Sequence, residues 1–139
     1  MVIISISAPS KTGKTTFLEE LIPRLKEKNI VVGALKHCHH PLSSAQNTDS
    51  KRLEKAGATP SIATQESTIE PLMPYFHGCD IVLVEGFRSA ALPSILLCRG
   101  TIDHTWEPPH NIIQTLDITD CEKAVHSALE GIQSLLFAQ

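Results

Sequence analysis

The residues best suited to chemistry form a short loop near the start of the chain. Residues 8–15 read A-P-S-K-T-G-K-T and stand between a strand-like apolar run and an amphipathic helical pattern. This is a P-loop pattern, in which backbone N–H groups face phosphate oxygens, a Lys neutralises the β- and γ-phosphates and a hydroxyl holds Mg²⁺. Gly13 suits a position where a Cβ would crowd the phosphates. The sequence therefore predicts nucleotide binding, with Ala8 in place of the usual first Gly as a mild departure.

A second candidate is Glu85, which stands at the end of the apolar run 80–86. In open parallel sheets, ligands bind beyond the carboxyl ends of the strands. A carboxylate there can hold Mg²⁺ or orient a water; the alternative is a solvated charge. We predict Lys14 and Glu85 as catalytic residues and Thr15 and Glu85 as metal ligands. The predicted nucleotide contacts are Pro9, Ser10, Lys11, Thr12, Gly13, Lys14, Thr15, Thr16, Lys36, His37 and Asp49.

The third candidate site is the segment 36–40, which reads K-H-C-H-H. Imidazole and thiolate are preferred zinc ligands, but adjacent side chains on a strand point to opposite faces, so this run cannot close a tetrahedral site alone. Lys36 and His37 can instead reach phosphate from the carboxyl end of a strand. An exposed polar loop is the remaining interpretation.

Residues 49–52, D-S-K-R, open a predicted helix after a polar loop at 41–48. Asp49 and Ser50 can simply cap that helix, with Lys51 and Arg52 on a solvated face. The alternative is a switch-like element that senses the γ-phosphate. The sequence leaves both interpretations open.

Strands and helices alternate along the chain. Strands are expected at 2–7, 30–35, 60–64, 80–86, 94–98 and 111–116, and helices through 17–25, 49–56, 67–78 and from a capping box at 119–122 to about 136. Pro23 should kink the first helix, and residues 100–110 should form a surface loop. This order predicts a three-layer α/β, P-loop NTPase-like fold with a mostly parallel sheet flanked by helices, as a single domain over residues 1–139.

The composition excludes several classes of protein. The chain has 139 residues, 42% of them hydrophobic, and a formal net charge of −3, which argues against a nucleic-acid backbone as partner. No apolar run approaches the roughly 18 residues of a membrane span, and the first residues lack the basic region of a signal peptide. The four cysteines are widely spaced without a C-x-x-C motif, which makes a disulfide framework unlikely. We expect a cytoplasmic protein that contacts neither membrane nor nucleic acid.

Several motifs resemble the molybdopterin-guanine dinucleotide biosynthesis protein B (MobB) family. They are K-H-C-H-H at 36–40, D-S at 49–50, K-A-G-A at 55–58, L-V-E-G-F-R at 83–88 and the stretches 15–18 and 21–23 after the P-loop. The resemblance implies a GTP-binding protein that uses Mg²⁺, forms a homodimer and assists the enzyme that joins GMP to molybdopterin. It also implies phosphate and Mg²⁺ contacts for Lys14 and Thr15, a metal-side role for Glu85 and a place near the γ-phosphate for Asp49.

The chain departs from that family in three places. Cys38 stands where the family commonly has Asp, the loop from 41 to 49 is short, and the connection before the final helix is reduced to residues 117–118. Loops at that last position typically help to recognise the base, and no Asn-Lys-x-Asp motif stands there. The preference for GTP over ATP therefore follows from the resemblance alone.

Three functions remain in view. The preferred one is a GTP-binding accessory protein of molybdenum cofactor biosynthesis with weak or partner-dependent GTP hydrolysis, its partner a molybdenum cofactor guanylyltransferase or another molybdopterin-pathway protein. The second is a small-molecule kinase using ATP, which usually needs an Arg-rich lid. The third is a nucleotide-dependent adapter without hydrolysis.

Overall fold

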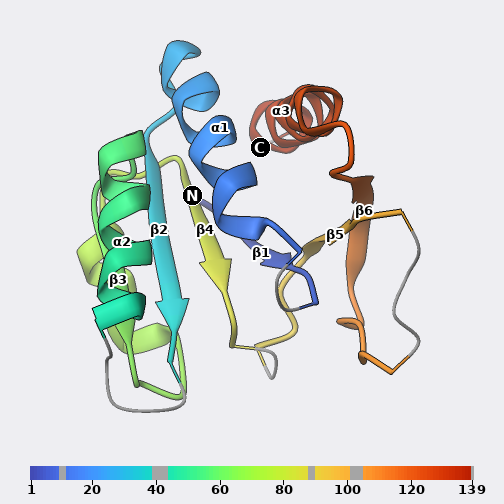
Figure 1. Ribbon diagram of the computed structural model, residues 1–139. Coiled ribbons are helices and arrows are strands. Elements are labelled where there is room, and N and C mark those ends of the chain that lie inside the picture. Colours follow the sequence, from blue (N-terminus) through green and yellow to red (C-terminus); the bar gives the residue numbers. More distant parts are fainter. Residues whose placement is uncertain (10–11, 39–43, 88–89, 101–104, 139) are drawn as a thin grey trace.

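A six-stranded parallel sheet forms the centre of the computed structural model, which describes residues 1–9, 12–38, 44–87, 90–100 and 105–138 (Figure 1). The strand order is β3-β2-β4-β1-β5-β6, and every neighbouring pair is parallel. The elements in chain order are β1 (Val2–Ser7), α1 (Lys14–Glu27), β2 (Val32–His37), α2 (Ser44–Ala56), β3 (Ser61–Thr64), the 3₁₀ helix η1 (Glu70–Phe76), β4 (Ile81–Glu85), β5 (Ser94–Cys98), β6 (Ile112–Asp117) and α3 (Cys121–Phe137).

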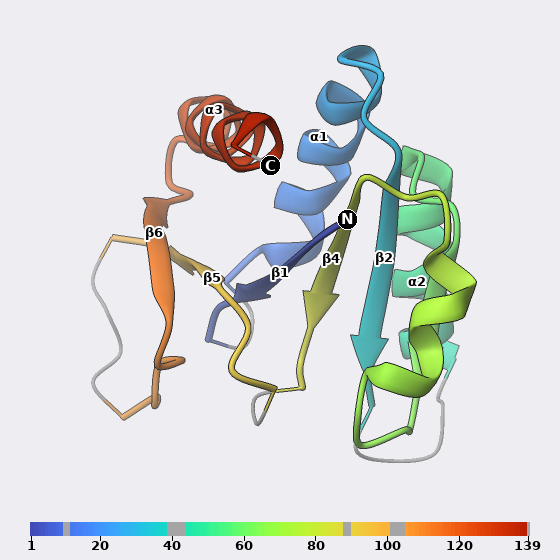
Figure 2. The same ribbon diagram turned by 180° about the vertical axis from the view of Figure 1, so that it is seen from behind.

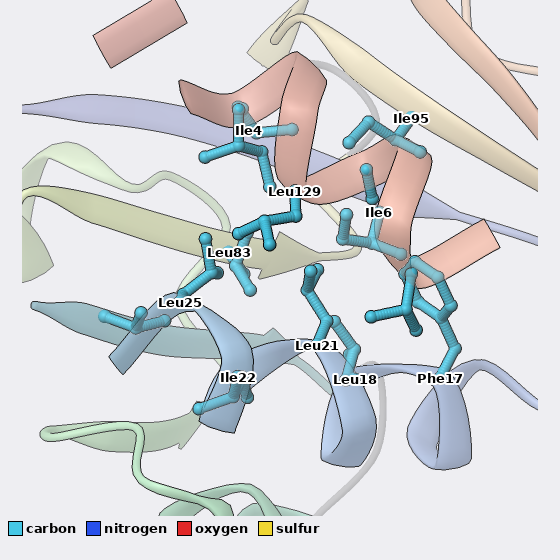
Figure 3. Packing of buried hydrophobic residues seen from close by; sticks show 14 of the residues in the cluster. Ile4, Ile6, Phe17, Leu18, Leu21, Ile22, Leu25, Leu83, Ile95 and Leu129 are labelled. Carbon is cyan, nitrogen blue, oxygen red and sulfur yellow. The ribbon is translucent and has the colours of Figure 1, made fainter. Parts of the chain in front are cut away.

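The main core lies between one face of the sheet and the helices α1, α2 and α3 (Figures 1 and 3). Alternate residues of β1, β2, β4 and β5 point into it, as the period of two requires. The helix α1 contributes five buried side chains, which are Phe17, Leu18, Leu21, Ile22 and Leu25. Burying each contributes about 1.5–3 kcal/mol, whereas an interior proline costs about 3 kcal/mol. This difference explains why α1 continues through Pro23 as one helix.

The opposite face of the sheet is covered less completely (Figure 2). There η1 packs over the half of the sheet formed by β2 and β4, in a cluster that includes Leu35, Leu72, Phe76 and Val82. The predicted α/β, P-loop NTPase-like fold with a parallel sheet is confirmed, and its two helical layers are unequal in size. No helix within the described ranges is long and apolar enough to cross a membrane.

Several element boundaries differ from those predicted, and three of the differences have a clear physical reason. The strand β2 begins at Val32 rather than at 30, because Asn29 (φ 61°) turns the chain and Ile30 N–H donates to Leu25 O to close α1. The helix α2 begins five residues earlier than expected, since a polar helical turn and a polar loop have similar composition. The cap of α3 is Asp120, which accepts from Lys123 N at 3.2 Å, so the capping box predicted from residue 119 was wrong.

The contact between β2 and η1 can be tested at Gly33. A Cβ on this residue would lie 2.5 Å from Phe76 Cδ1, inside a buried cluster. We expect Gly33→Ala to lower the free energy of unfolding by about 1–3 kcal/mol, because overpacking forces neighbours apart. Urea unfolding measures the change. Phe76→Leu in the same chain should recover part of the loss, so that the double variant is more stable than the sum of the single effects; strict additivity would contradict this packing.

Candidate functional site

The P-loop joins β1 to α1 and is fixed by two hydrogen bonds. Inside the loop, Thr12 Oγ1 donates to Pro9 O at 2.5 Å. From outside, Arg99 Nε donates to the carbonyl oxygen of Thr12 at 3.0 Å. Gly13, directly before α1, has a φ of 106°, a conformation that side-chain-bearing residues rarely adopt. The loop thus has the tight turn at the start of α1 that phosphate binding requires.

Lys14 and Glu85 meet at the carboxyl end of the sheet. β1 and β4 are neighbours in parallel register, so the residue that ends β4 lies beside the loop that follows β1. Lys14 Nζ lies 2.8 Å from Glu85 Oε1, and the two side chains are only 20% and 21% exposed. The predicted pair is therefore brought together. A phosphate can take Lys14 from this pair and leave the carboxylate for a cation.

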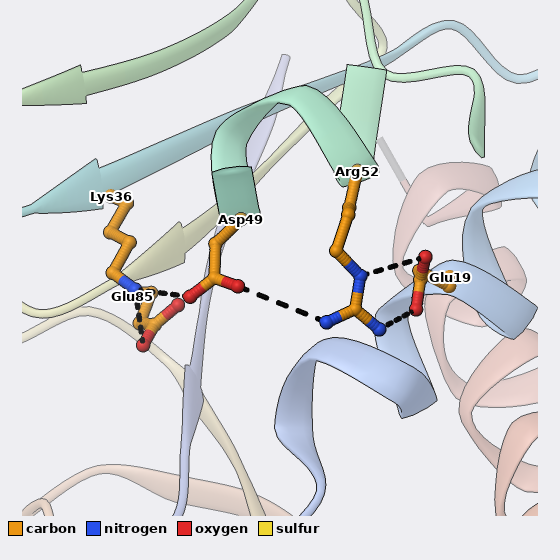
Figure 4. Close-up of polar contacts among 5 residues, drawn as sticks. All are labelled: Glu19, Lys36, Asp49, Arg52 and Glu85. Atoms are coloured by element: carbon orange, nitrogen blue, oxygen red, sulfur yellow. Dashed lines mark hydrogen bonds and ion pairs between the residues drawn. The ribbon is translucent and has the colours of Figure 1, made fainter. Parts of the chain in front are cut away.

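Lys36 extends this ion pair toward α2 (Figure 4). Its Nζ lies 3.0 Å from Asp49 Oδ2 and 3.8 Å from Glu85 Oε1, because β2 and β4 pair with Lys36 opposite Glu85. Burial alone would lower the pKa of Lys36, but the carboxylates of Glu85 and Asp49 outweigh it and hold the pKa above its ordinary value. Lys36 therefore stays positively charged between two carboxylates.

Arg52 ties α2 to α1 on the other side of Asp49 (Figure 4). Its Nε donates to Glu19 Oε2 at 3.1 Å, its Nη2 donates to Glu19 Oε1, and its Nη1 lies 3.9 Å from Asp49 Oδ1. The hydrogen bond to Glu19 raises the pKa of Arg52 further. Arg52 is not among the predicted site residues, although its spacing of three from Asp49 places both on one helix face. Within the described residues, these contacts make one charge network from Lys14 to Glu19.

One pocket of about 420 Å³ collects most of the predicted residues. It is lined by Ala8, Pro9, Thr12, Gly13, Lys14, Thr15, Thr16, Lys36, Asp49, Arg52 and Glu85. Two predicted phosphate contacts, Ser10 and Lys11, lie outside the described residues. The mixture of cations, hydroxyls and carboxylates suits a polyphosphate accompanied by a hard cation.

His37 is the predicted contact that does not line this pocket. It follows Lys36 on β2 and so points to the opposite face of the sheet, where its ring centroid lies 4.7 Å from that of Phe87. Gly86 permits this packing, since a Cβ there would lie 2.7 Å from His37 Cβ. Phe87 itself has a φ of 55°, which is uncommon for a bulky residue.

The zinc interpretation of residues 36–40 gains no support from the described part of the chain. No group of three or more His, Cys, Asp or Glu side chains there is placed to hold a metal ion, while His39 and His40 lie outside the described residues. Burial raises the pKa of the Cys38 thiol, which keeps it protonated and apolar in character. Cys38 therefore behaves as a core residue at the end of β2.

The donor set around Lys14 fits magnesium better than zinc. Thr15 supplies a hydroxyl and Glu85 and Asp49 supply carboxylates to one pocket, and Mg²⁺ prefers oxygen ligands of this kind together with phosphate oxygens and waters. Bound Mg²⁺ would neutralise phosphate charge there. Lys14 pairs with Glu85 and Lys36 pairs with Asp49.

Comparison with known proteins agrees with this arrangement. A family model described as "Molybdopterin guanine dinucleotide synthesis protein B" (MobB) matches residues 3–117. A molybdopterin-guanine dinucleotide biosynthesis adapter protein of Escherichia coli is 31% identical, with 94% of this chain and 93% of that protein aligned. The chain belongs to the MobB family. The adapter protein of the same name from Haemophilus influenzae is 34% identical. This chain aligns with 63% of that protein's length, which is less than two thirds.

Solved MobB structures share the fold. A MobB homologue from Bacillus stearothermophilus superposes with a TM-score of 0.62 at 16% identity, over 96% of this chain and 99% of that one. Bacillus subtilis MobB gives 0.57 at 22% identity, over 94% and 97% of the two chains. A designed P-loop NTPase fold gives 0.57 at 11% identity, over 95% and 91%. At these identities the likeness shows the P-loop NTPase-like fold.

The charge of Lys36 can be tested through the pH dependence of stability. Its pKa is above 10.5 in the folded chain, so its ion pairs stabilise the fold below pH 10.5 and this contribution is lost as pH rises through the folded-state pKa. We expect Lys36→Met to lower the free energy of unfolding by about 1 kcal/mol at pH 7, because the pair is partly exposed. The difference from wild type should shrink by pH 11.

Urea unfolding of both proteins at pH 7, 9 and 11 measures this difference. Lys55→Met, an exposed lysine of α2, is the matched control and should match wild type throughout. A Lys36→Met deficit that stays constant to pH 11 would mean that lost packing, rather than lost charge, causes it.

Proposed function

We propose that this chain is a nucleotide-binding adapter of molybdopterin guanine dinucleotide biosynthesis that binds GTP with Mg²⁺. The observation that carries the proposal is the Lys14–Glu85 pair at the mouth of a P-loop, in a member of the MobB family. The adapter proteins of E. coli and H. influenzae supply the pathway by their names. The proposed partner is a molybdenum cofactor guanylyltransferase or another molybdopterin-pathway protein, in the cytoplasm.

Each residue has a defined role in this proposal. Lys14 leaves Glu85 and neutralises the β- and γ-phosphates, while Thr15 and Glu85 hold Mg²⁺ directly or through water. Backbone N–H groups of the loop after Pro9 and of the start of α1 bind the phosphates. In this proposal Asp49 and Lys36 lie near the γ-phosphate. Loss of a phosphate charge there would alter the ion pair between Lys36 and Asp49 of α2.

Hydrolysis, where it occurs, is proposed to be slow or dependent on a partner. Positioning and charge neutralisation carry phosphoryl transfer, and a water must be oriented for attack. Within the described residues, the carboxylates of the pocket are already held by Lys14, Lys36 and Arg52. An adapter without hydrolysis is the second candidate, because these ion pairs disfavour freeing a carboxylate to act as a general base.

The binding proposal is tested by substituting the P-loop lysine. Lys14→Ala should weaken GTP binding in the presence of Mg²⁺ by roughly tenfold to a hundredfold or more, because a charge-assisted contact to phosphate is lost. Isothermal titration calorimetry measures both proteins. Lys28→Ala, an exposed lysine just after α1, is the control and should bind as wild type does.

Parallel measurement of phosphate release separates the candidates. Tight GTP binding without release, with or without pathway proteins, favours the adapter, and release stimulated by such a protein favours the partner-dependent GTPase. Consumption of ATP with a phosphorylated small molecule would favour a kinase instead. If neither purine nucleotide binds, the proposal fails.

The proposed homodimer has its own test. The family resemblance supplies this expectation, and we expect analytical ultracentrifugation at micromolar concentration to give twice the chain's 15.2 kDa. The edge strand β6 carries Ile112 and Ile113 at 39% and 45% exposure, which is compatible with a contact surface. Sedimentation as a monomer across the whole micromolar range would remove the dimer from the proposal.

A further inference from the structure

Arg99 is a charged residue at the P-loop that the proposed phosphate chemistry does not use. It directly follows β5, and its Nε donates to the carbonyl oxygen of Thr12 at 3.0 Å, a contact between residues 87 positions apart. Its Nη2 lies 3.0 Å from the point that a Cβ on Gly13 would occupy. The guanidinium therefore rests against the turn of the loop itself. Among the described residues no ion pair within 4 Å includes Arg99, and the side chain is exposed.

Arg99 and the residues proposed to bind phosphate and cation lie on opposite sides of the P-loop. The strand β1, which leads into the P-loop, lies between β4 and β5 in the sheet. Glu85 and the ion pairs of Lys36 lie on the β4 side, and Arg52 closes that side by joining α2 to α1. A nucleotide whose phosphates and cation occupy this charged side must extend its sugar and base toward the other flank. That flank is formed by the ends of β5 and β6.

The surroundings of Arg99 keep its outer donors available. Within the described part of the chain, Nε donates to Thr12 O, and the N–H groups of Nη1 and Nη2 remain in the rigid planar fork of the guanidinium. The next residue, Gly100, donates its N–H to Asp117 Oδ1 at 3.2 Å, and Thr119 N–H donates to the same oxygen at 2.9 Å. These contacts fasten the end of β5 to the end of β6. Hydrogen bonds from the Thr119 side chain and N–H, together with the Gly100 N–H, hold the pKa of Asp117 below its usual value, and Arg99 adds an electrostatic attraction to the same carboxylate.

We propose that Arg99 reads the base of the bound nucleotide and gives the site its preference for guanine over adenine. A guanidinium fork matches the two acceptors O6 and N7 of guanine, which it binds with two hydrogen bonds. Adenine has the N6 amino group in place of O6, so two donors would face each other. The inference rests on the proposed nucleotide site and assigns its specificity to a residue outside any Asn-Lys-x-Asp motif.

The competing explanation is that Arg99 only supports the P-loop from outside. A supporting residue acts on every triphosphate equally, because all of them use the same phosphate cradle. A base-reading residue acts on nucleotides that carry O6 and leaves the others nearly unchanged. The two explanations are therefore separated by comparing nucleotides rather than by the size of any single loss.

The test is a matrix of Kd values for GTP, ITP and ATP with Mg²⁺, measured by isothermal titration calorimetry on wild type, Arg99→Ala, Arg99→Lys and Arg24→Ala. ITP retains O6 and N7 but lacks the 2-amino group of guanine, so it isolates the edge that Arg99 would contact. Lysine can still donate to Thr12 O but lacks the fork. Arg24, on α1 away from the pocket lining, is the matched loss of one arginine.

We expect wild type to bind GTP and ITP more tightly than ATP. Arg99→Ala should weaken GTP and ITP by roughly tenfold to a hundredfold, the value of a good bidentate contact, with ATP changed no more than about threefold. Arg99→Lys should keep ATP affinity and lose most of the preference, and Arg24→Ala should match wild type. Urea unfolding of each variant checks that the fold is retained.

Two results would overturn the inference. Equal losses for all three nucleotides in both Arg99 variants would make Arg99 a support of the loop. Equal affinity of wild type for GTP and ATP would leave no preference to explain. Both results presuppose nucleotide binding that Lys14→Ala weakens, so they are distinct from failure of the proposed function, in which wild type binds none of the three.

Discussion

The contact between Lys14 and Glu85 depends on the pairing of two strands that are far apart in the chain. β1 and β4 run side by side in parallel, and this alone brings a lysine at the start of α1 to within 2.8 Å of a carboxylate 71 residues later. Placing β4 between β1 and β2 also brings Lys36 opposite Glu85. Lys36 in turn links the pair to Asp49 of α2. The sheet order is therefore the constraint from which the site follows.

The charge network makes α2 part of the site rather than a neighbour of it. Asp49 contacts Lys36 of the sheet, and Arg52, one turn later, contacts Glu19 of α1. The helix α2 is thus held from both sides by ion pairs instead of by a long apolar face, and Leu53 is its deeply buried anchor among residues 49–56. Partly exposed ion pairs contribute little each and are sensitive to local charge. A change of charge at the P-loop therefore acts on α2 more strongly than on the apolar core.

The sequence was informative where chemistry and pattern coincide. The P-loop, the strand leading to Glu85 and the strand leading to Lys36 each combine a periodic apolar run with a polar residue at its end, and the carboxyl ends of parallel strands lie at one edge of the sheet. His37 does not line the pocket of the P-loop, because alternation along β2 separates two neighbours that the motif presents together. Prediction failed at the start of α2, where no apolar period marks the helix. Arg99 could not have been found, because its contact to Thr12 is made with a backbone carbonyl and depends on β5 lying next to β1.

The two residues after Glu85 have a mechanical consequence. Gly86 and Phe87 both have positive φ values, 91° and 55°, so the chain turns sharply as soon as β4 ends. This turn lets His37 and Phe87 stack on the far side of the sheet while Glu85 stays on the near side, and Phe87 holds a conformation that costs of the order of 1–3 kcal/mol. A side chain at Gly86 would wedge β2 away from β4 and so widen the spacing between lysine and carboxylate on the other face. The orientation of Glu85 thus depends on two neighbouring residues that do not themselves line the pocket of the P-loop.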